Sequence, residues 1–378
     1  MEDNTVPPPV AAPPPLSPPP VIAPPSPGPG RRRGRGWMIF ALVVLVLLGF
    51  SVLLNLGHLM RGLVPVRVTR LHQSGPRLEE VVTEDNDVST KIAVIKLEGL
   101  ITSEALDQGG FSVVEVIKAQ LQRAEEDDRV KAVILKVDSP GGEVLASDEI
   151  NRALTDFQGK LHGKPVVCSM GNLAASGGYY VAAACRWIVA NDLTITGSIG
   201  VILSAWNYRG LMNKVGLRPE TFKSGKYKDM LSGSREPDTI TDDERRMVQA
   251  LVDETYSKFK TVVAEGRLRA HEKNRDKGRA LSGDWADYAD GRILSGKEAF
   301  QLGYVDELGT FAEAVKRAKS VAGIRSANLV EYQQRYDISD LFRLFGQTEG
   351  KTVKVDLGVE LPKLRAGQLY FLSPTFLH

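Results

Sequence analysis

An uncharged apolar run of 20 residues, Trp37–Leu56, is the feature that most limits how this chain can fold. At about 1.5 Å per helical residue, a helix of that length crosses the roughly 30 Å hydrocarbon layer of a bilayer. Buried helices of soluble proteins seldom stay apolar around their whole circumference over such a distance. We therefore predict a transmembrane helix over residues 37–56. A cleaved signal peptide is less favoured, because no small-residue cleavage site follows the run.

Basic residues on the two sides of this run predict its orientation. Four arginines lie within residues 31–35, whereas Arg61, Arg67 and Arg70 are spread more widely on the other side. Positive charge favours the cytoplasmic side, so we expect a single-pass protein of the cell membrane with a cytoplasmic N-terminus and an extracytoplasmic C-terminal domain. The arginine cluster alone could bind RNA. However, 48 Lys and Arg against 46 Asp and Glu give no basic excess, and we predict no nucleic-acid partner.

Proline dominates the start of the chain, where residues 1–30 hold 13 of the 21 prolines. Proline fixes φ and lacks an N–H donor, so this segment is expected to be extended and disordered, with docking to a polyproline-binding partner as the alternative. The predicted organisation has five parts. They are a Pro-rich cytoplasmic tail with the arginine cluster (1–36), the membrane helix (37–56), a linker (57–87), a folded domain (88–335) and a C-terminal extension (336–378).

The folded domain alternates predicted strands with predicted helices. Its strands are near-continuous apolar runs such as VKAVILKV at 130–137, which is typical of strands buried on both faces of a largely parallel sheet. We therefore predict an α/β fold. The predicted strands are 92–97, 130–137, 165–169, 188–190 and 199–203, and the predicted helices are 112–127, 143–157, 176–185 and 242–266.

Cysteine content excludes two classes of site. The two cysteines, Cys168 and Cys185, are too few for a disulfide scaffold or a zinc site built from cysteine pairs. Both lie in apolar or small-residue runs, so we expect buried free thiols. No His, Cys and carboxylate cluster has metal-ligand spacing, and we predict no metal or other cofactor.

Two glycine-rich turns follow predicted strands, at residues 138–142 (DSPGG) and 171–180 (GNLAASGGYY). Sites of parallel α/β sheets form beyond the carboxyl ends of strands. Ser176 lies at or near the start of a helix there and could act as a nucleophile. One backbone N–H group from each turn could then hold the oxyanion, because glycine leaves the backbone open to close approach. The alternative is that both turns are only tight connections.

A serine nucleophile needs a base, and none of the five histidines has a suggestive acidic neighbour. A lysine can serve if burial lowers its pKa from about 10.4. The candidates are Lys223, Lys226 and Lys228, and their spacing alone does not rank them.

Four motifs together resemble the signal peptide peptidase A (SppA) family of serine peptidases. They are DSPGG at 138–142, AASGGYY at 174–180, TGSIGV at 196–201 and KSGKYKDM at 223–230. The resemblance covers about residues 90–325, and the chain is similar to the short form of the family, with one catalytic repeat.

The resemblance implies a Clp-protease/crotonase-like fold, here preceded by one transmembrane helix, and a role for each matching residue. Ser176 matches the nucleophile and Lys228 the general base of a Ser-Lys dyad. Ser198 matches a hydroxyl that orients the lysine, and Gly142 and Gly177 match the oxyanion hole.

The resemblance also implies partners. We expect a homo-oligomer in which Lys228 acts on Ser176 of an adjacent subunit, and an endopeptidase at the membrane lipid bilayer that degrades remnant signal peptides. A catalytically silent membrane scaffold on the same fold and a crotonase-like acyl-CoA enzyme are the alternatives.

Residues 367–372 (GQLYFL) are predicted to form a strand that ends before Pro374. This strand would pack on the body of the domain or on a neighbouring chain, or it would lie in the active-site groove as a self-peptide.

Overall fold

The computed structural model describes residues 40–48, 51, 75–105, 110–275, 277–334 and 369–372. The chain divides into two units, Met1–His72 and Gln73–His378. In the first unit, residues 40–48 and Ser51 are helical, with exposed apolar side chains.

The predicted membrane helix is not confirmed. No helix among the described residues is both long and apolar enough to cross a bilayer. Much of the predicted span, together with the Pro-rich tail and most of the predicted linker and C-terminal extension, lies outside the described residues.

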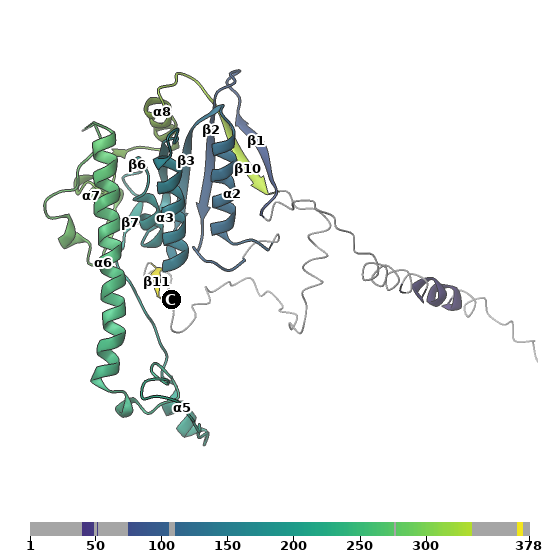
Figure 1. The fold of residues 1–378 in the computed structure, drawn as a ribbon, viewed down its shortest axis with the longest axis vertical. Coiled ribbons are helices and arrows are strands. Elements are labelled where there is room, and N and C mark those ends of the chain that lie inside the picture. Colours follow the sequence, from purple (N-terminus) through teal and green to yellow (C-terminus); the bar gives the residue numbers. More distant parts are fainter. Residues whose placement is uncertain are drawn as a thin grey trace, which may run out of the picture. The chain divides into compact units, whose positions relative to one another are not determined.

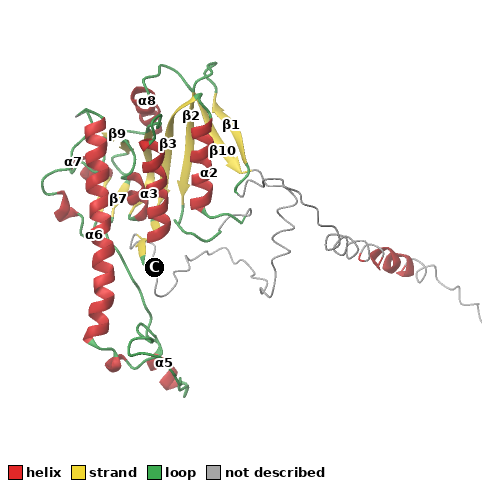
Figure 2. Ribbon diagram, in the orientation of Figure 1, coloured by secondary structure: helices red, strands yellow, loops and turns green. Residues whose placement is uncertain are grey.

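The second unit is a mixed α/β structure built on one large sheet (Figures 1 and 2). Its described strands run in the order β1-β10-β2-β3-β5-β6-β9, and β7 pairs with both β5 and β8. All pairs are parallel except β1–β10 and β7–β8, which confirms the predicted largely parallel sheet. The bounds are β1 Leu78–Glu84, β2 Lys91–Glu98, β3 Val130–Ser139, β5 Val166–Ala175, β6 Trp187–Ala190, β7 Ile195–Gly197, β8 Ile293–Ser295, β9 Glu307–Leu308 and β10 Asn328–Gln334.

A separate two-stranded antiparallel sheet joins β4, Gly141–Glu143, to β11, Tyr370–Leu372. The described helices of this unit are α2 Val113–Glu126, α3 Val144–Gly159, α4 Gly177–Ala182, α5 Arg209–Lys214, α6 Asp242–Lys273, α7 Gly296–Gln301 and α8 Phe311–Val321.

Helices cover both faces of the large sheet. In β2, Ala93, Ile95 and Leu97 join the core cluster that includes α2, α3 and α4. Ile92 and Val94 of the same strand join the cluster that includes α8. Successive strand side chains point to opposite faces, so a strand buried on both faces must be apolar throughout. The first of these clusters includes Cys168, and its burial raises the pKa of the thiol, which keeps it protonated.

Helix α6 is the longest element of this unit. It has 32 residues and begins at a capping box made by Thr241 and Glu244. Its second half packs on the domain, where a Cβ at Gly266 would lie 2.2 Å from the Ala183 carbonyl oxygen. The first half extends beyond the sheet with α5 (Figure 1). We call residues 203–251 the arm.

The strand predicted at 199–203 is wrong. The strand in this region is β7, and it ends where Gly197 and Ser198 both adopt positive φ, at 73° and 50°. Ile199 is buried without a ladder partner, and Ile202 forms only an isolated bridge with Tyr370. Ile199 is buried and Val201 packs partly buried against the core, so packing accounts for these two apolar residues without a strand.

A buried ion pair fastens α6 to the sheet. The Arg267 guanidinium donates to Asp306 Oδ1, and both side chains are fully buried. The other carboxylate oxygen of Asp306 accepts from the Ile188 N–H of β6 at 2.8 Å. This pair therefore joins the second half of α6 to β6.

We predict that Arg267→Met destabilises the folded domain by about 3–5 kcal/mol, because it leaves the Asp306 carboxylate buried without a charge partner. Chemical denaturation measures this free energy of unfolding. Lys316→Met is the control, since Lys316 and Glu313 form an exposed pair worth about 1 kcal/mol or less. Equal losses in the two variants would contradict the structural role of the buried pair.

Candidate active site

Ser176 stands at the sharp turn between β5 and α4. Its backbone has φ 55° and ψ −118°, a sparsely populated conformation for a residue with a side chain. The Ser176 N–H donates to the Gly197 carbonyl at 2.8 Å, and the Tyr180 N–H donates to the Ser176 carbonyl at 2.8 Å. These two bonds hold the strained turn against β7 and against the first turn of α4.

The Ser176 hydroxyl is buried and unengaged. The residue is 1% exposed, and its Oγ has no hydrogen-bond partner among the described residues. A buried hydroxyl without a partner is costly, so its presence beside two glycine turns calls for an explanation. Because Ser176 Oγ has no partner, no histidine in the described part of the chain forms a hydrogen bond with it.

The two predicted glycine turns meet beside this serine. Strands β3 and β5 are parallel neighbours, with Ser139 opposite Ala174. As a result, a Cβ at Gly177 would lie 3.1 Å from the Gly142 backbone nitrogen and 3.1 Å from the Gly141 Cα. The backbone nitrogens of Gly142 and Gly177 therefore belong to one small region next to Ser176. No side chain other than hydrogen fits between them.

Polar side chains hold the first turn in shape. The Ser139 hydroxyl donates to the Gly99 carbonyl at 2.6 Å and accepts from the Gly141 N–H at 3.1 Å. Asp138 accepts from the Leu173 N–H at 3.1 Å, which ties the first turn to β5. These contacts explain why a serine and an aspartate precede the two glycines.

Ser198 lies directly beside Ser176. Strands β5 and β7 pair in parallel, with Ala175 opposite Gly197 at their ends. Ser176 directly follows β5 and Ser198 directly follows β7, so the two serines are neighbours. Ser198 is buried and has φ 50°, and its N–H donates to the Arg292 carbonyl at 2.7 Å.

The three candidate lysines lie on the arm in different environments. Lys223 forms an ion pair with Asp229 at 2.7 Å. A hydrogen bond with Tyr227 raises the pKa of the Lys226 amine, which lies 4.8 Å from the ring centre of that tyrosine. Lys228 is exposed, and its amine has no ion pair or hydrogen bond within the described ranges.

Comparison with known proteins decides the family. The model of peptidase family S49 matches residues 159–325. A Synechocystis protein whose name describes a protease is 38% identical over 271 residues, which cover 71% of this chain and 88% of that one. An Enterococcus faecium protein named as a signal peptide peptidase SppA is 33% identical, covering 70% of this chain and 74% of its own. The chain belongs to peptidase family S49.

A plant relative supports the same class of activity. The chloroplastic serine protease SPPA of Arabidopsis thaliana is 32% identical over 247 residues, which cover 64% of this chain and 34% of that one. The chain is therefore an SppA-family peptidase of the serine type, which confirms the resemblance drawn from the four motifs.

Four of the five predicted site residues come together in this S49 peptidase. Ser176, Ser198, Gly142 and Gly177 gather at the ends of β5, β7 and β3. Lys228 stands apart on the arm, with no hydrogen bond to Ser176 in the described part of the chain. Its role stays a prediction, as do the roles of the other four residues.

One feature of the site was missed by sequence reasoning. Gly141, with φ 101°, is as tightly placed as Gly142, because a Cβ there would lie 2.6 Å from the Gly177 nitrogen. The two consecutive glycines of DSPGG at 138–142 are the sequence feature that could have indicated this close approach. Strand β11, which lies within the strand predicted at residues 367–372, lies directly against Gly141 and Gly142.

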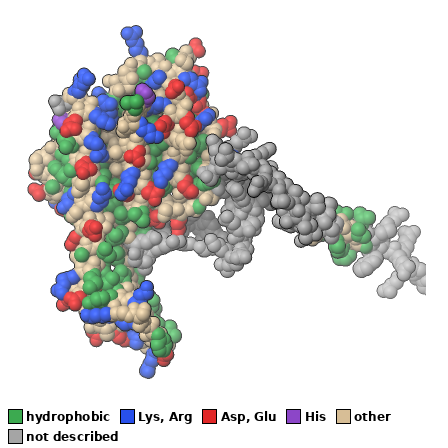
Figure 3. Space-filling model, viewed as in Figure 1, with side chains coloured by type: hydrophobic (Ala, Val, Ile, Leu, Met, Phe, Trp, Pro, Cys, Tyr) green, Lys and Arg blue, Asp and Glu red, His purple; other side chains and the backbone are tan. Residues whose placement is uncertain are grey.

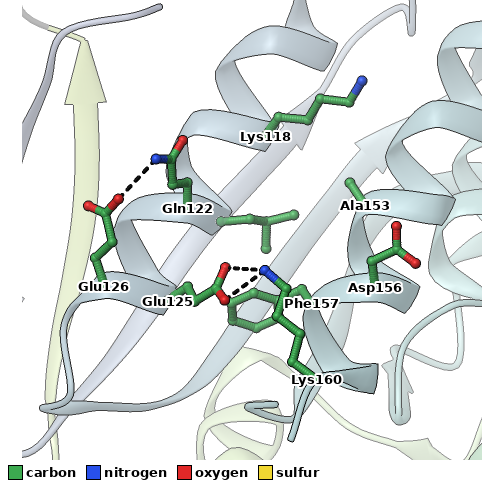
Figure 4. A pocket seen from close by; sticks show the side chains of 9 residues that line it. Lys118, Gln122, Glu125, Glu126, Ala153, Asp156, Phe157 and Lys160 are labelled. Carbon is green, nitrogen blue, oxygen red and sulfur yellow. Dashed lines mark hydrogen bonds and ion pairs between the residues drawn. The ribbon is translucent and has the colours of Figure 1, made fainter. Parts of the chain in front are cut away.

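A separate surface cavity lies between α2 and α3 and belongs to no part of this site. Leu121 and Phe157 are buried residues of its lining. Lys160 forms an ion pair with Glu125 at 2.7 Å across the cavity (Figure 4). Its lining residues come from those two helices, which cover the sheet, and include none of the five predicted site residues.

We predict that Gly141→Ala lowers kcat/KM for peptide hydrolysis by about 100-fold, since a small misplacement of reacting groups costs that much. The added Cβ would strain a positive-φ residue and collide with the backbone around Gly177. Gly159→Ala at the end of α3 is the matched control, because nothing lies within 4 Å of its new methyl group. Full activity in both variants would mean that this turn does not position the reaction.

Proposed function

We propose that this S49 peptidase is a membrane-anchored endopeptidase that degrades remnant signal peptides with a Ser-Lys dyad. The observation that carries the proposal is the buried, unpartnered Ser176 hydroxyl beside two converging glycine turns. A peptide carbonyl bound there would meet a nucleophile on one side and two backbone N–H groups on the other.

The proposed reaction has two steps. The Ser176 oxygen attacks the substrate carbonyl carbon while the Lys228 amine takes the hydroxyl proton. The Gly142 and Gly177 N–H groups stabilise the oxyanion, the carbon–nitrogen bond breaks, and the proton passes to the leaving amine. Water, activated by the same amine, then releases the acyl group and restores Ser176.

Lys228 is favoured over its neighbours by its surroundings. A base must lose its proton, and the Asp229 carboxylate beside Lys223 and the Tyr227 contact of Lys226 both favour the charged form. Lys228 has neither contact. Burial at an interface with a second subunit would supply the dry environment that a neutral amine needs.

The surface of the arm supports such an interface. Phe222 is 93% exposed and Trp206 is 82% exposed, and Leu211, Val215 and Leu217 are also exposed. Figure 3 shows hydrophobic side chains gathered toward this end of the molecule. Large contiguous apolar patches on a soluble surface mark association sites. We infer that the arm packs on another copy of the chain, and that Lys228 acts on Ser176 of that copy.

The proposed substrate class and location rest on the apolar run Trp37–Leu56 and the arginines before it. A membrane anchor with a cytoplasmic N-terminus would hold the peptidase unit outside the cytoplasm, next to released signal peptides. Short apolar peptides would bind as an added strand along the site.

We predict that Ser176→Ala and Lys228→Ala each lower kcat for peptide hydrolysis by roughly 10⁴-fold or more, because the dyad acts as a unit. Lys228→Arg is equally inactive, since a guanidinium stays protonated. Lys226→Ala is the control and retains activity. If Lys226→Ala were inactive and Lys228→Ala active, the base would be Lys226, and the assignment to Lys228 would be wrong.

Mixing the two inactive variants tests the contact between subunits. Oligomers assembled from both Ser176→Ala and Lys228→Ala chains contain sites with an intact serine next to an intact lysine. They regain part of the activity if the lysine acts between subunits. No recovery in oligomers shown by mass to be mixed would contradict that arrangement.

A further inference from the structure

Lys228 lies in a part of the arm that has no regular secondary structure. Residues 215–236, which the structure describes in full, contain neither a helix nor a strand. A general base must come within about 2.6–3.2 Å of the proton that it removes. A side chain on an irregular segment does not reach such a position reproducibly unless other contacts hold its backbone. Those contacts must come from side chains around the turn that carries Lys228.

Asp229, the residue after Lys228, anchors this turn. Its Oδ1 accepts from the Lys223 amine at 2.7 Å and lies 3.5 Å from Arg235 Nη1. The Asp229 carbonyl accepts from the Ser232 N–H at 3.1 Å. The hydrogen bond from Lys223 holds the pKa of Asp229 below its ordinary value, so the carboxylate stays charged. Both the side chain and the backbone of Asp229 therefore restrain the residue before it.

Arg235 connects this turn to the first turn of α6. Its guanidinium donates to Glu244 Oε1 at 2.5 Å and to the Thr239 carbonyl at 2.5 Å. The Glu244 side chain is only 4% exposed, and its Oε2 accepts from the Thr241 N–H at 2.8 Å and from the Thr241 hydroxyl at 3.1 Å. Glu244 is thus fixed within the cap of a 32-residue helix. Through Arg235, the turn of Lys228 is attached to that helix.

The same contacts direct the Asp229 charge away from the base. A carboxylate close to an amine favours the protonated form of the amine. Asp229 follows Lys228 in sequence, but its ion-pair partners in the described part of the arm are Lys223 and Arg235. The carboxylate is therefore shared by two other cations. Lys228 can lose its proton more readily than it could beside an unpaired aspartate.

We propose that Arg235 is a positioning residue for the general base. It joins the Asp229 carboxylate to Glu244 at the start of α6, so it holds the turn of Lys228 in place and keeps Asp229 engaged. Arg235 does not touch the substrate and acts only through Lys228. The inference rests on the proposed function, because that function makes Lys228 the base.

Arg235→Gln tests this role. We expect kcat for peptide hydrolysis to fall about 100-fold with KM unchanged, because the base is misplaced while the binding of the peptide is not affected. Arg246→Gln is the matched control and retains activity, since Arg246 pairs with Asp243 on the same half of α6 and both side chains are exposed. Thermal unfolding and native mass check that each variant is folded and assembled. Full activity of Arg235→Gln, or a loss that lies only in KM, would overturn the proposal.

Glu244→Gln separates the anchor of Arg235 from the cap of α6. Glutamine also closes a capping box, so the contact with the Thr241 N–H is kept while the charge that binds Arg235 is removed. We expect kcat to fall about tenfold, as for loss of one hydrogen bond to a charged group. Adding Glu244→Gln to Arg235→Gln causes no further loss, because the two residues act as one unit. Full activity of Glu244→Gln, or losses that multiply in the double variant, would contradict this anchor.

Mixed oligomers show on which chain Arg235 acts. In the sites that regain activity, Ser176→Ala chains supply the lysine and Lys228→Ala chains supply the serine. Arg235→Gln lowers the recovered activity about 100-fold when it is on the Ser176→Ala chain, and has no effect when it is on the Lys228→Ala chain. A general loss of folding or assembly would act from either chain. Equal effects from the two chains would therefore overturn the positioning role.

These outcomes separate the inference from the proposed function. Full activity of Lys228→Ala would remove the Ser-Lys dyad, whatever Arg235→Gln shows. An inactive Lys228→Ala together with a fully active Arg235→Gln would leave the dyad standing and overturn only the role of Arg235. If mixed oligomers recover no activity, the lysine acts within its own chain, and the kcat and KM of Arg235→Gln decide its role.

Discussion

The parallel pairing of β3 with β5 is the contact on which the site depends. It brings two glycine turns, far apart in sequence, to the same edge of the sheet. The pairing of β5 with β7 then sets Ser176 beside Ser198. The first half of β5 and most of β3 are buried, and their pairing holds the two turns at one edge of the sheet. A shift of one residue in this pairing would separate the Gly142 and Gly177 nitrogens.

Backbone strain is concentrated where these strands end. Ser176 and Ser198 both have positive φ, a conformation that costs a residue with a side chain about 1–3 kcal/mol. The bond from the Ser176 N–H to the Gly197 carbonyl ties the two turns together. The surrounding parallel sheet supplies the stability that keeps them in place. The Ser176 hydroxyl is therefore held in one buried position. A flexible loop would not hold it there.

Much of this arrangement could be predicted from the sequence, and the failures have physical causes. The apolar runs at 92–97 and 130–137 became β2 and β3, because strands buried on both faces leave a strong signal. Local preference predicts a turn at Gly171 and Asn172, yet β5 runs on through them because residues 173–175 pair with β7. Spacing alone does not rank the three lysines, and only the resemblance to the family assigns the base to Lys228. Their ranking depends on neighbours that only the folded arm supplies.

The central claim is that Ser176 becomes a nucleophile because the Lys228 amine accepts its proton. Labelling of the full-length protein with a fluorophosphonate, followed by mass mapping of the modified peptide, tests it most directly. The account predicts a single adduct on Ser176, present in Lys226→Ala and absent in Lys228→Ala. An adduct on another serine, or equal labelling of Ser176 without Lys228, would contradict it.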